Sequence, residues 1–94
     1  MDILARYGGE EFIIILNYDN TKEIVNYVKR IKQLIEDREF KYKDNIIDVK
    51  FSGGIAFRGN HNSPIETINK ADHLLYEAKN QGRDKVILED GTII

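Results

Sequence analysis

The chain has 94 residues, enough for one domain with its own hydrophobic core, and its 41% hydrophobic and 32% charged residues exclude a disordered chain. Its net charge of −2 comes from 14 basic and 16 acidic residues mixed along the sequence, which lacks the basic stripe typical of nucleic-acid binding. The absence of cysteine excludes disulfides and thiolate metal sites, and no apolar run approaches the ~20 residues of a membrane helix.

Two short runs near the start of the chain predict a β-hairpin. Residues 3–7 are mixed in character, residues 12–16 are continuously apolar, and Gly8-Gly9 lies between them. Glycine accepts the positive φ that a two-residue hairpin turn requires. The continuous apolar run suits a strand that is covered on both faces.

The next segment predicts an amphipathic helix. Asn20 and Glu23 have the spacing of a capping box, and the helix is expected to fade over residues 37–40. Apolar residues recur three and four apart and form one face: Ile24, Tyr27, Val28, Ile31, Leu34 and Ile35. The polar residues 41–45 that follow predict a loop.

Residues 47–57 alternate between apolar and polar side chains, which predicts a single strand with period two. Gly53 and Gly54 lie within it and indicate either a bulge or a close approach of another backbone.

A second helix has the clearest start signal in the chain. Ser63 is expected to be the N-cap, Pro64 the first helical residue and Glu66 the capping-box partner. Gly82 suits the position just after the helix. The face expected to be buried consists of small and apolar residues: Ile68, Ala71, Leu74, Leu75 and Ala78.

Residues 85–89 predict a last strand, and Asp90-Gly91 predicts a turn after which residues 92–94 fold back as a short partner. The expected order is β-β-α-β-α-β with a short C-terminal hairpin. This order indicates an α+β fold, with helices and strands in two layers.

Two groups of residues suggest binding chemistry. The turn at Gly8 and Gly9 lets a ligand approach the backbone, and Glu10 beside it can reach a divalent ion that holds phosphates. Lys79 and Arg83 are four residues apart, so on a helix they would share a face that suits a polyphosphate. The alternatives are a solvated surface hairpin whose acids pair with Arg6, and cations that complement a helix dipole.

Three motifs in order resemble the diguanylate cyclase (GGDEF) domain family. Residues 6–12 read RYGGEEF, residues 52–56 read SGGIA, and residues 71–86 follow the family pattern A-D-x-x-L-Y-x-A-K-x-x-G-R-x-x-V at every fixed position. The resemblance implies that residues 1–94 form a single partial domain, the C-terminal half that starts at the signature hairpin. The implied fold is a truncated ferredoxin-like palm of the nucleotidyl cyclase type.

The resemblance also implies a function in bacterial, cytoplasmic signalling. Family members join two GTP molecules into cyclic di-GMP and release two pyrophosphates, using Mg²⁺ or Mn²⁺. By this resemblance Glu10 is a metal ligand that helps to activate the attacking hydroxyl, and Glu11 is a second catalytic acid. Gly8 and Gly9 shape the turn over the nucleotide. Lys79 and Arg83 contact the triphosphate.

Asp2 matches the aspartate of the family's R-x-x-D product-inhibition motif, as a remnant of that site. In the family, an aspartate that binds metal, a lysine that binds phosphate and residues that read guanine precede this position. We therefore expect the isolated chain to be inactive, and to form homo-oligomers or pair with another GGDEF domain. No nucleic-acid or membrane contact is expected.

Two other functions remain open at this point: a non-catalytic interaction module, and a nucleotide or divalent-ion binder without turnover. The remaining conspicuous side chains have structural explanations. His61 and His73 are expected to be structural or solvated, and Phe12 and Tyr76 to be core residues.

Overall fold

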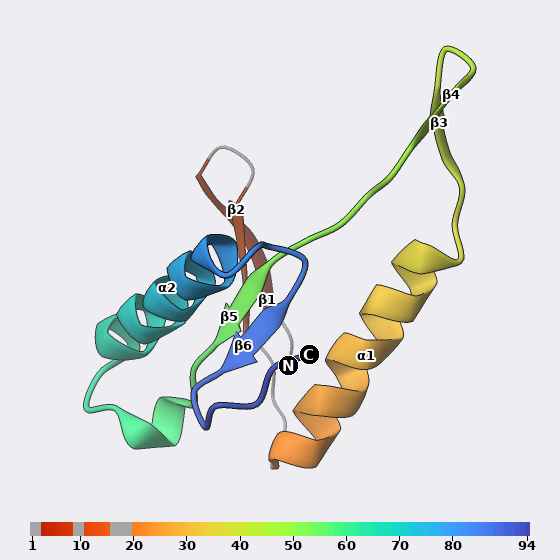
Figure 1. The fold of residues 1–94 in the computed structure, drawn as a ribbon. Coiled ribbons are helices and arrows are strands. Elements are labelled where there is room, and N and C mark those ends of the chain that lie inside the picture. The colour runs from red at the N-terminus through yellow and green to blue at the C-terminus, as the bar shows by residue number, and fades with distance from the viewer. Residues whose placement is uncertain (1–2, 9–10, 16–19) are drawn as a thin grey trace.

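The computed structural model describes the backbone of residues 3–8, 11–15 and 20–94, and the side chains from Asn20 onward. It contains the helices α1 (Thr21–Glu36) and α2 (Pro64–Asn80), together with a single 3₁₀ turn, η1 (Arg58–Asn60) (Figure 1). The strands pair two by two: β1 (Ile3–Gly8) with β2 (Glu11–Ile15), β3 (Phe40–Tyr42) with β4 (Asn45–Ile47), and β5 (Gly53–Ile55) with β6 (Val86–Leu88). The α+β class predicted from the sequence is confirmed.

The parallel pair β5–β6 lies at the centre of the fold. Gly53 aligns with Val86 and Ile55 with Leu88. On its other side β6 pairs with the last residues of the chain, because Val86 and Ile94 exchange two backbone hydrogen bonds of 2.9 and 2.8 Å. Gly91 closes the connecting turn with a φ of 94°, so the predicted C-terminal hairpin is confirmed.

The two helices cover opposite faces of β6, because successive side chains of a strand point to opposite sides (Figure 1). Val86 and Leu88 are buried against Ile24 and Val28 of α1. Ile87 points the other way and is buried with two residues of α2, Leu74 and Ala78. The apolar faces predicted for both helices therefore supply the core.

Gly54 is where α2 comes closest to the sheet. A Cβ atom at this position would lie 2.2 Å from the carbonyl oxygen of Ala71 and 2.4 Å from the amide nitrogen of Leu75. Both are backbone atoms of the helix, so only glycine allows this approach. Of the two explanations offered for Gly53 and Gly54, close backbone approach therefore holds at Gly54.

The predicted helix caps are present. Asn20 Oδ1 accepts from the Glu23 amide at 2.9 Å, and Ser63 Oγ accepts from the Glu66 amide at 3.2 Å. Glu66 reaches back to the amide of Asn62, one residue before the cap, at 2.9 Å. These contacts satisfy amides that a helix N-terminus otherwise leaves unpaired.

The segment between α1 and β5 differs from the prediction. The expected loop at residues 41–45 is part of the β3–β4 hairpin, whose two turn residues, Lys43 and Asp44, have φ values of 49° and 67°. Positive φ at both positions is the geometry of a type I′ turn, which glycine or asparagine usually signals. The single strand predicted over residues 47–57 is correspondingly divided between the end of β4 and β5.

Some predicted core positions are exposed. Tyr76 is 63% exposed on the outer face of α2, so its assignment to the core was wrong. Leu34, predicted on the apolar face of α1, is 55% exposed. Ile47 and Val49, in the segment between α1 and β5, are 46% and 37% exposed. Phe12, the other aromatic residue assigned to the core, has a side chain outside the described part.

Candidate functional site

The signature sequence lies at the turn of the first hairpin. β1 and β2 are antiparallel, with Arg6 opposite Phe12 and Gly8 opposite Glu11, and the register shifts between Arg6 and Gly8. This confirms a hairpin, although Gly8 is the last residue of β1 and not part of the turn predicted at Gly8 and Gly9. Two of the predicted site residues, Gly8 and Glu11, lie at its closed end. Gly9 and Glu10 lie between them, outside the described residues, as does Asp2.

The second group of predicted site residues lies where the chain leaves α2. Lys79 is in the last helical turn, Gln81 is the C-cap and Gly82 follows with a φ of 105°. The Arg83 amide donates to the Ala78 carbonyl at 2.9 Å, which is the 6→1 bond of a Schellman motif.

Arg83 therefore lies beyond the helix, with a φ of 64°. Lys79 and Arg83 do not share a helical face as predicted, because the helix ends between them. Both residues still belong to one short exit segment of α2.

Two contacts from other elements anchor this exit segment. The Asp84 amide donates to Ser52 Oγ, just before β5, at 3.1 Å. Lys32 of α1 lies 3.4 Å from the Asp84 carbonyl oxygen and 4.0 Å from its carboxylate. Asp84 also has a positive φ of 52°. Because non-glycine residues rarely adopt such φ values, the contacts of Ser52 and Lys32 explain how the turn beside Arg83 keeps this shape.

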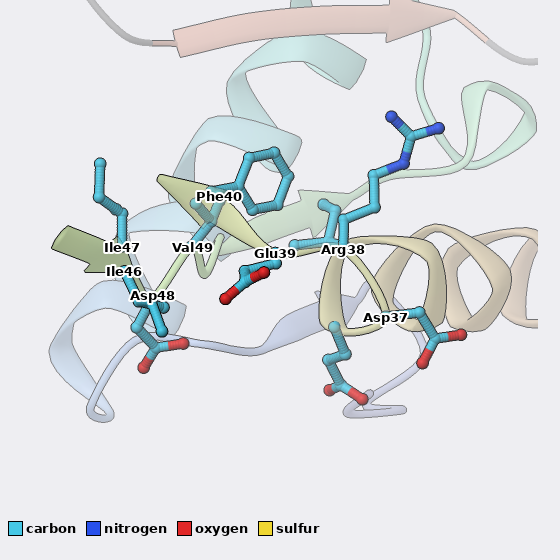
Figure 2. Close-up of a pocket in the computed structure, with 10 residues that line it drawn as sticks. Asp37, Arg38, Glu39, Phe40, Ile46, Ile47, Asp48 and Val49 are labelled. Atoms are coloured by element: carbon cyan, nitrogen blue, oxygen red, sulfur yellow. The ribbon is translucent and has the colours of Figure 1, made fainter. Parts of the chain in front are cut away.

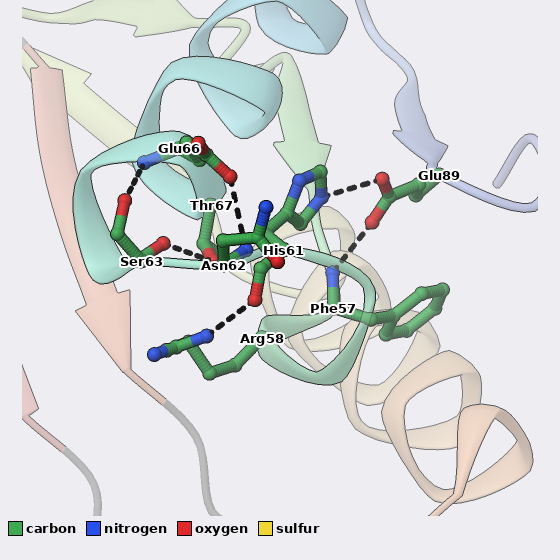
Figure 3. A network of polar contacts seen from close by, with 8 residues as sticks. All are labelled: Phe57, Arg58, His61, Asn62, Ser63, Glu66, Thr67 and Glu89. Atoms are coloured by element: carbon green, nitrogen blue, oxygen red, sulfur yellow. Dashed lines mark hydrogen bonds and ion pairs between the residues drawn. The ribbon is translucent and has the colours of Figure 1, made fainter.

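A separate polar network joins η1 to the end of β6 (Figure 3). Glu89 Oε2 lies 2.6 Å from His61 Nε2, and Glu89 Oε1 accepts from the Phe57 amide at 2.8 Å. The side chains of His61 and Glu89 are only 16% and 13% exposed. The structural role predicted for His61 is therefore confirmed, whereas His73 makes a surface contact of 3.1 Å with Glu77.

This network lowers the pKa of Glu89 below its usual range. Burial raises the pKa of the carboxyl group, but the hydrogen bonds from the Phe57 amide and His61, and the charge of His61, outweigh burial. Glu89 is thus held as a carboxylate that fastens the turn at residues 57–61 to the central strands.

The described side chains do not form a metal-binding cluster. Among residues 20–94, no three histidine, aspartate or glutamate side chains come together in a way that could hold an ion. No helix within the described part is long and apolar enough to cross a membrane.

Comparison with known proteins assigns these motifs to a family. The model of the family described as "Diguanylate cyclase, GGDEF domain" matches residues 1–85, which include the signature hairpin and the exit of α2. The chain belongs to the GGDEF domain family. The resemblance seen in the three motifs is thereby confirmed.

Diguanylate cyclases from several bacteria are similar to this GGDEF chain. Diguanylate cyclase A of Treponema denticola is 33% identical over 96 residues, which cover 98% of this chain and 25% of the relative. DgcZ of Escherichia coli K12 is 34% identical, covering 95% of this chain and 30% of the relative. DgcP of Pseudomonas aeruginosa is also 34% identical, over a stretch that covers 90% of this chain and 13% of the relative. The chain thus spans less than a third of the length of these relatives.

The sequence did not reveal what holds the GGDEF motifs in place. Ser52 stood within a recognised motif without a role, and the structure shows that it anchors the exit of α2. Lys32 gave no sequence signal, because it is one of several lysines on the polar face of α1 and its partner lies 52 residues away. His61 and Glu89 are likewise 28 residues apart.

Proposed function

We propose that this GGDEF chain carries the phosphate-binding part of a diguanylate cyclase site, for the reaction that converts two GTP molecules into cyclic di-GMP and two pyrophosphates. The observation that carries the proposal is the signature sequence at the closed end of the β1–β2 hairpin. The family match supports it, since it spans this hairpin and the exit of α2 together.

In this proposal Lys79 and Arg83 bind the triphosphate. Two cations on one short segment neutralise adjacent phosphate oxygens, and the guanidinium group can bind them through two hydrogen bonds. The Schellman turn and the contact between Ser52 and the Asp84 amide restrict the backbone beside Arg83. A restricted backbone lowers the entropy lost when the ligand binds.

The residues of the signature sequence form the metal-binding part of the proposed site. Gly8 and Gly9 allow the nucleotide to approach the backbone, Glu10 supplies a carboxylate oxygen for Mg²⁺ or Mn²⁺, and Glu11 is the second acid. Mg²⁺ is commonly held by one or two carboxylates together with substrate phosphates, which suits this small acidic set. When bound, the ion neutralises charge on the phosphates.

The proposed site implies that the 94-residue chain binds the nucleotide but does not convert it into cyclic di-GMP. Phosphoryl transfer depends on several positioned charges around the reacting phosphate. The proposed site supplies two cations at the exit of α2, Lys79 and Arg83, and the two acids of the signature, Glu10 and Glu11. Cyclisation also needs a second GTP, which we assign to a second GGDEF domain, either another copy or a different protein. Because GTP is the substrate, the proposed location is the cytoplasm.

A titration with GTP and Mg²⁺ tests the binding role. The Lys79→Ala/Arg83→Ala variant should bind GTP at least about tenfold more weakly than the wild type, since each charge-assisted hydrogen bond contributes roughly 1.5–3 kcal/mol. Lys70→Ala, which removes a lysine from an earlier turn of the same helix, should leave the affinity unchanged. Equal affinity of the wild type and the double variant would contradict the proposal.

A purely interacting module is the second candidate function. It would associate with another GGDEF domain and show no GTP affinity in the same titration. The observation that favours it is the exposed apolar surface of the β3–β4 hairpin.

A further inference from the structure

Lys32 of α1 contacts oxygen atoms of two other segments of the chain. Its ammonium group lies 3.4 Å from the Asp84 carbonyl oxygen, 3.4 Å from the Ile94 carbonyl oxygen and 4.0 Å from the Asp84 carboxylate. The side chain is only 19% exposed, whereas Lys29, three residues earlier on the same helix, is exposed. The charge of Lys32 thus lies between α1, the exit of α2 and the last residue of the chain.

The position of Lys32 along α1 makes this contact a link between the helix and the exit of α2. The two buried residues of α1, Ile24 and Val28, come before it, and Lys32 follows one turn later. From Ile35 onward the helix end lines a groove of about 490 Å³ together with the β3–β4 hairpin (Figure 2). Figure 1 shows this hairpin projecting away from the helices and strands of the core. Lys32 therefore joins α1 to the exit of α2 just beyond the buried part of the helix.

Asp84 places a negative charge directly beside a residue that we assign to phosphate binding. It follows Arg83 in the chain, and its side chain is 47% exposed. Charges on adjacent residues interact, because physiological salt screens charges only beyond about 8 Å. An uncompensated carboxylate at this position would oppose the binding of a polyphosphate by Arg83.

The backbone explains why an acidic residue suits this position. Asp84 has a φ of 52°, and aspartate and asparagine adopt left-handed backbone conformations more readily than most residues. Its amide donates to Ser52 Oγ at 3.1 Å, which holds the turn in place. Asparagine would serve this backbone conformation equally well without a charge. The carboxylate is therefore unfavourable for phosphate binding, and a nearby cation offsets it.

We propose that Lys32 is a positioning residue for the phosphate site. It neutralises the Asp84 carboxylate and holds the carbonyl oxygen of the same residue, so that Arg83 binds a polyphosphate from a fixed turn without a competing negative charge. Lys32 acts through Asp84 and does not contact the ligand. This inference rests on the proposed binding of GTP by Lys79 and Arg83. Because exposed ion pairs are individually weak, the effect on affinity is a few-fold.

A purely structural tie is the alternative role for Lys32. Its contact with the Ile94 carbonyl oxygen lies beside the two backbone hydrogen bonds that join Ile94 to Val86. A tie of this kind would hold α1 against the end of the chain whatever the charge of Asp84. Loss of the ammonium group would then lower stability, and removal of the Asp84 charge would not restore the affinity for GTP.

Calorimetric titration with GTP and Mg²⁺ tests the proposal. Lys32→Met keeps the apolar stem of the side chain and removes the ammonium group. This variant should bind GTP about threefold or more weakly than the wild type. Lys32→Arg retains the charge and should keep the affinity. Lys29→Met, the same charge change at an exposed position of α1, is the matched control and should bind like the wild type. Circular dichroism checks that each variant is folded.

The double variant Lys32→Met/Asp84→Asn is the decisive sample. It should regain the affinity of the wild type, because the uncompensated carboxylate is gone, and Asp84→Asn alone should bind GTP at least as tightly as the wild type. Wild-type affinity of Lys32→Met would overturn the proposal. So would a double variant that stays as weak as Lys32→Met, or an equal loss in Lys29→Met.

The Lys79→Ala/Arg83→Ala variant in the same titration separates this inference from the function on which it rests. If that variant binds GTP more weakly while Lys32→Met binds like the wild type, the proposed function stands and the role of Lys32 is wrong. If it binds GTP like the wild type, or the wild type binds none, the proposed function fails and the role of Lys32 fails with it.

Discussion

Gly54 lies where the backbone of α2 crosses β5, and the contact is too close for any side chain. Gly54→Ala would place Cβ 2.2 Å from a helix carbonyl oxygen, so α2 must move away from the sheet. We expect a loss of about 1–3 kcal/mol in the free energy of unfolding, the usual cost of overpacking a core. Urea denaturation measures it.

Gly59→Ala is the matched control, because nothing lies within 4 Å of the added Cβ in η1. It should change stability by less than about 0.5 kcal/mol. Similar losses for the two variants would contradict the account of Gly54.

Glu89 should make stability depend on pH in the acid range. Its pKa in the folded chain is lowered, whereas an unfolded glutamate titrates near ~4.3, so the unfolded chain binds the proton more readily. The stabilisation is therefore complete above that value and is lost as the pH falls through the folded pKa. Glu89→Gln should flatten this part of the curve of unfolding free energy against pH.

Glu77→Gln provides the comparison for Glu89. Glu77 also contacts a histidine, His73, but its side chain is 42% exposed on α2. The acid-range slope should persist in this variant. A slope that survives in Glu89→Gln would show that the network at His61 does not hold the carboxylate.

At the scale of elements, α2 is fixed at both ends by a serine hydroxyl. Ser63 caps its start, and Ser52 holds the segment that follows its end. Ser63→Ala and Ser52→Ala should each cost about 1 kcal/mol in unfolding free energy. Only Ser52→Ala should also weaken GTP binding, by a few-fold, because only Ser52 restrains the turn beside Arg83. A calorimetric titration of both variants checks this, and equal affinities would contradict it.

Local signals in the sequence predicted these helices well. Asn20, Ser63 and Gly82 act through neighbours within five residues, so the spacing of the sequence contains the whole interaction. Gly54 also gave a correct signal, since an interior glycine in a strand indicates a close neighbour.

The β3–β4 hairpin was not predicted, because its turn lacks the usual sequence signal. Its turn residues are Lys43 and Asp44, and neither is the glycine or asparagine that marks positive φ. The alternation of residues 47–57 then favoured a single strand, although Ile47 and Val49 face solvent on the projecting segment. The contacts of Lys32 with Asp84 and of His61 with Glu89 could not be predicted, because they depend on how distant elements pack.

At the scale of the whole molecule, the core and the candidate site occupy different regions. α1 and α2 bury β6 between them, while Gly8 and Glu11 of the signature lie at the closed end of the β1–β2 hairpin, and Lys79 and Arg83 lie at the exit of α2. This separation means that substitutions at Glu10, Lys79 or Arg83 should leave the fold intact. Binding and stability can therefore be measured independently in this GGDEF chain.

In the proposed function, the chain holds GTP through part of a diguanylate cyclase site without joining two molecules. The direct measurement is chromatography of the products after incubation of the 94-residue chain with GTP and Mg²⁺, beside a Glu10→Ala control. We expect no cyclic di-GMP above that control, because phosphoryl transfer depends on several positioned charges and the proposed site supplies only the two acids of the signature and the two cations at the exit of α2. Cyclic di-GMP formed by the wild type above the level of Glu10→Ala would contradict it.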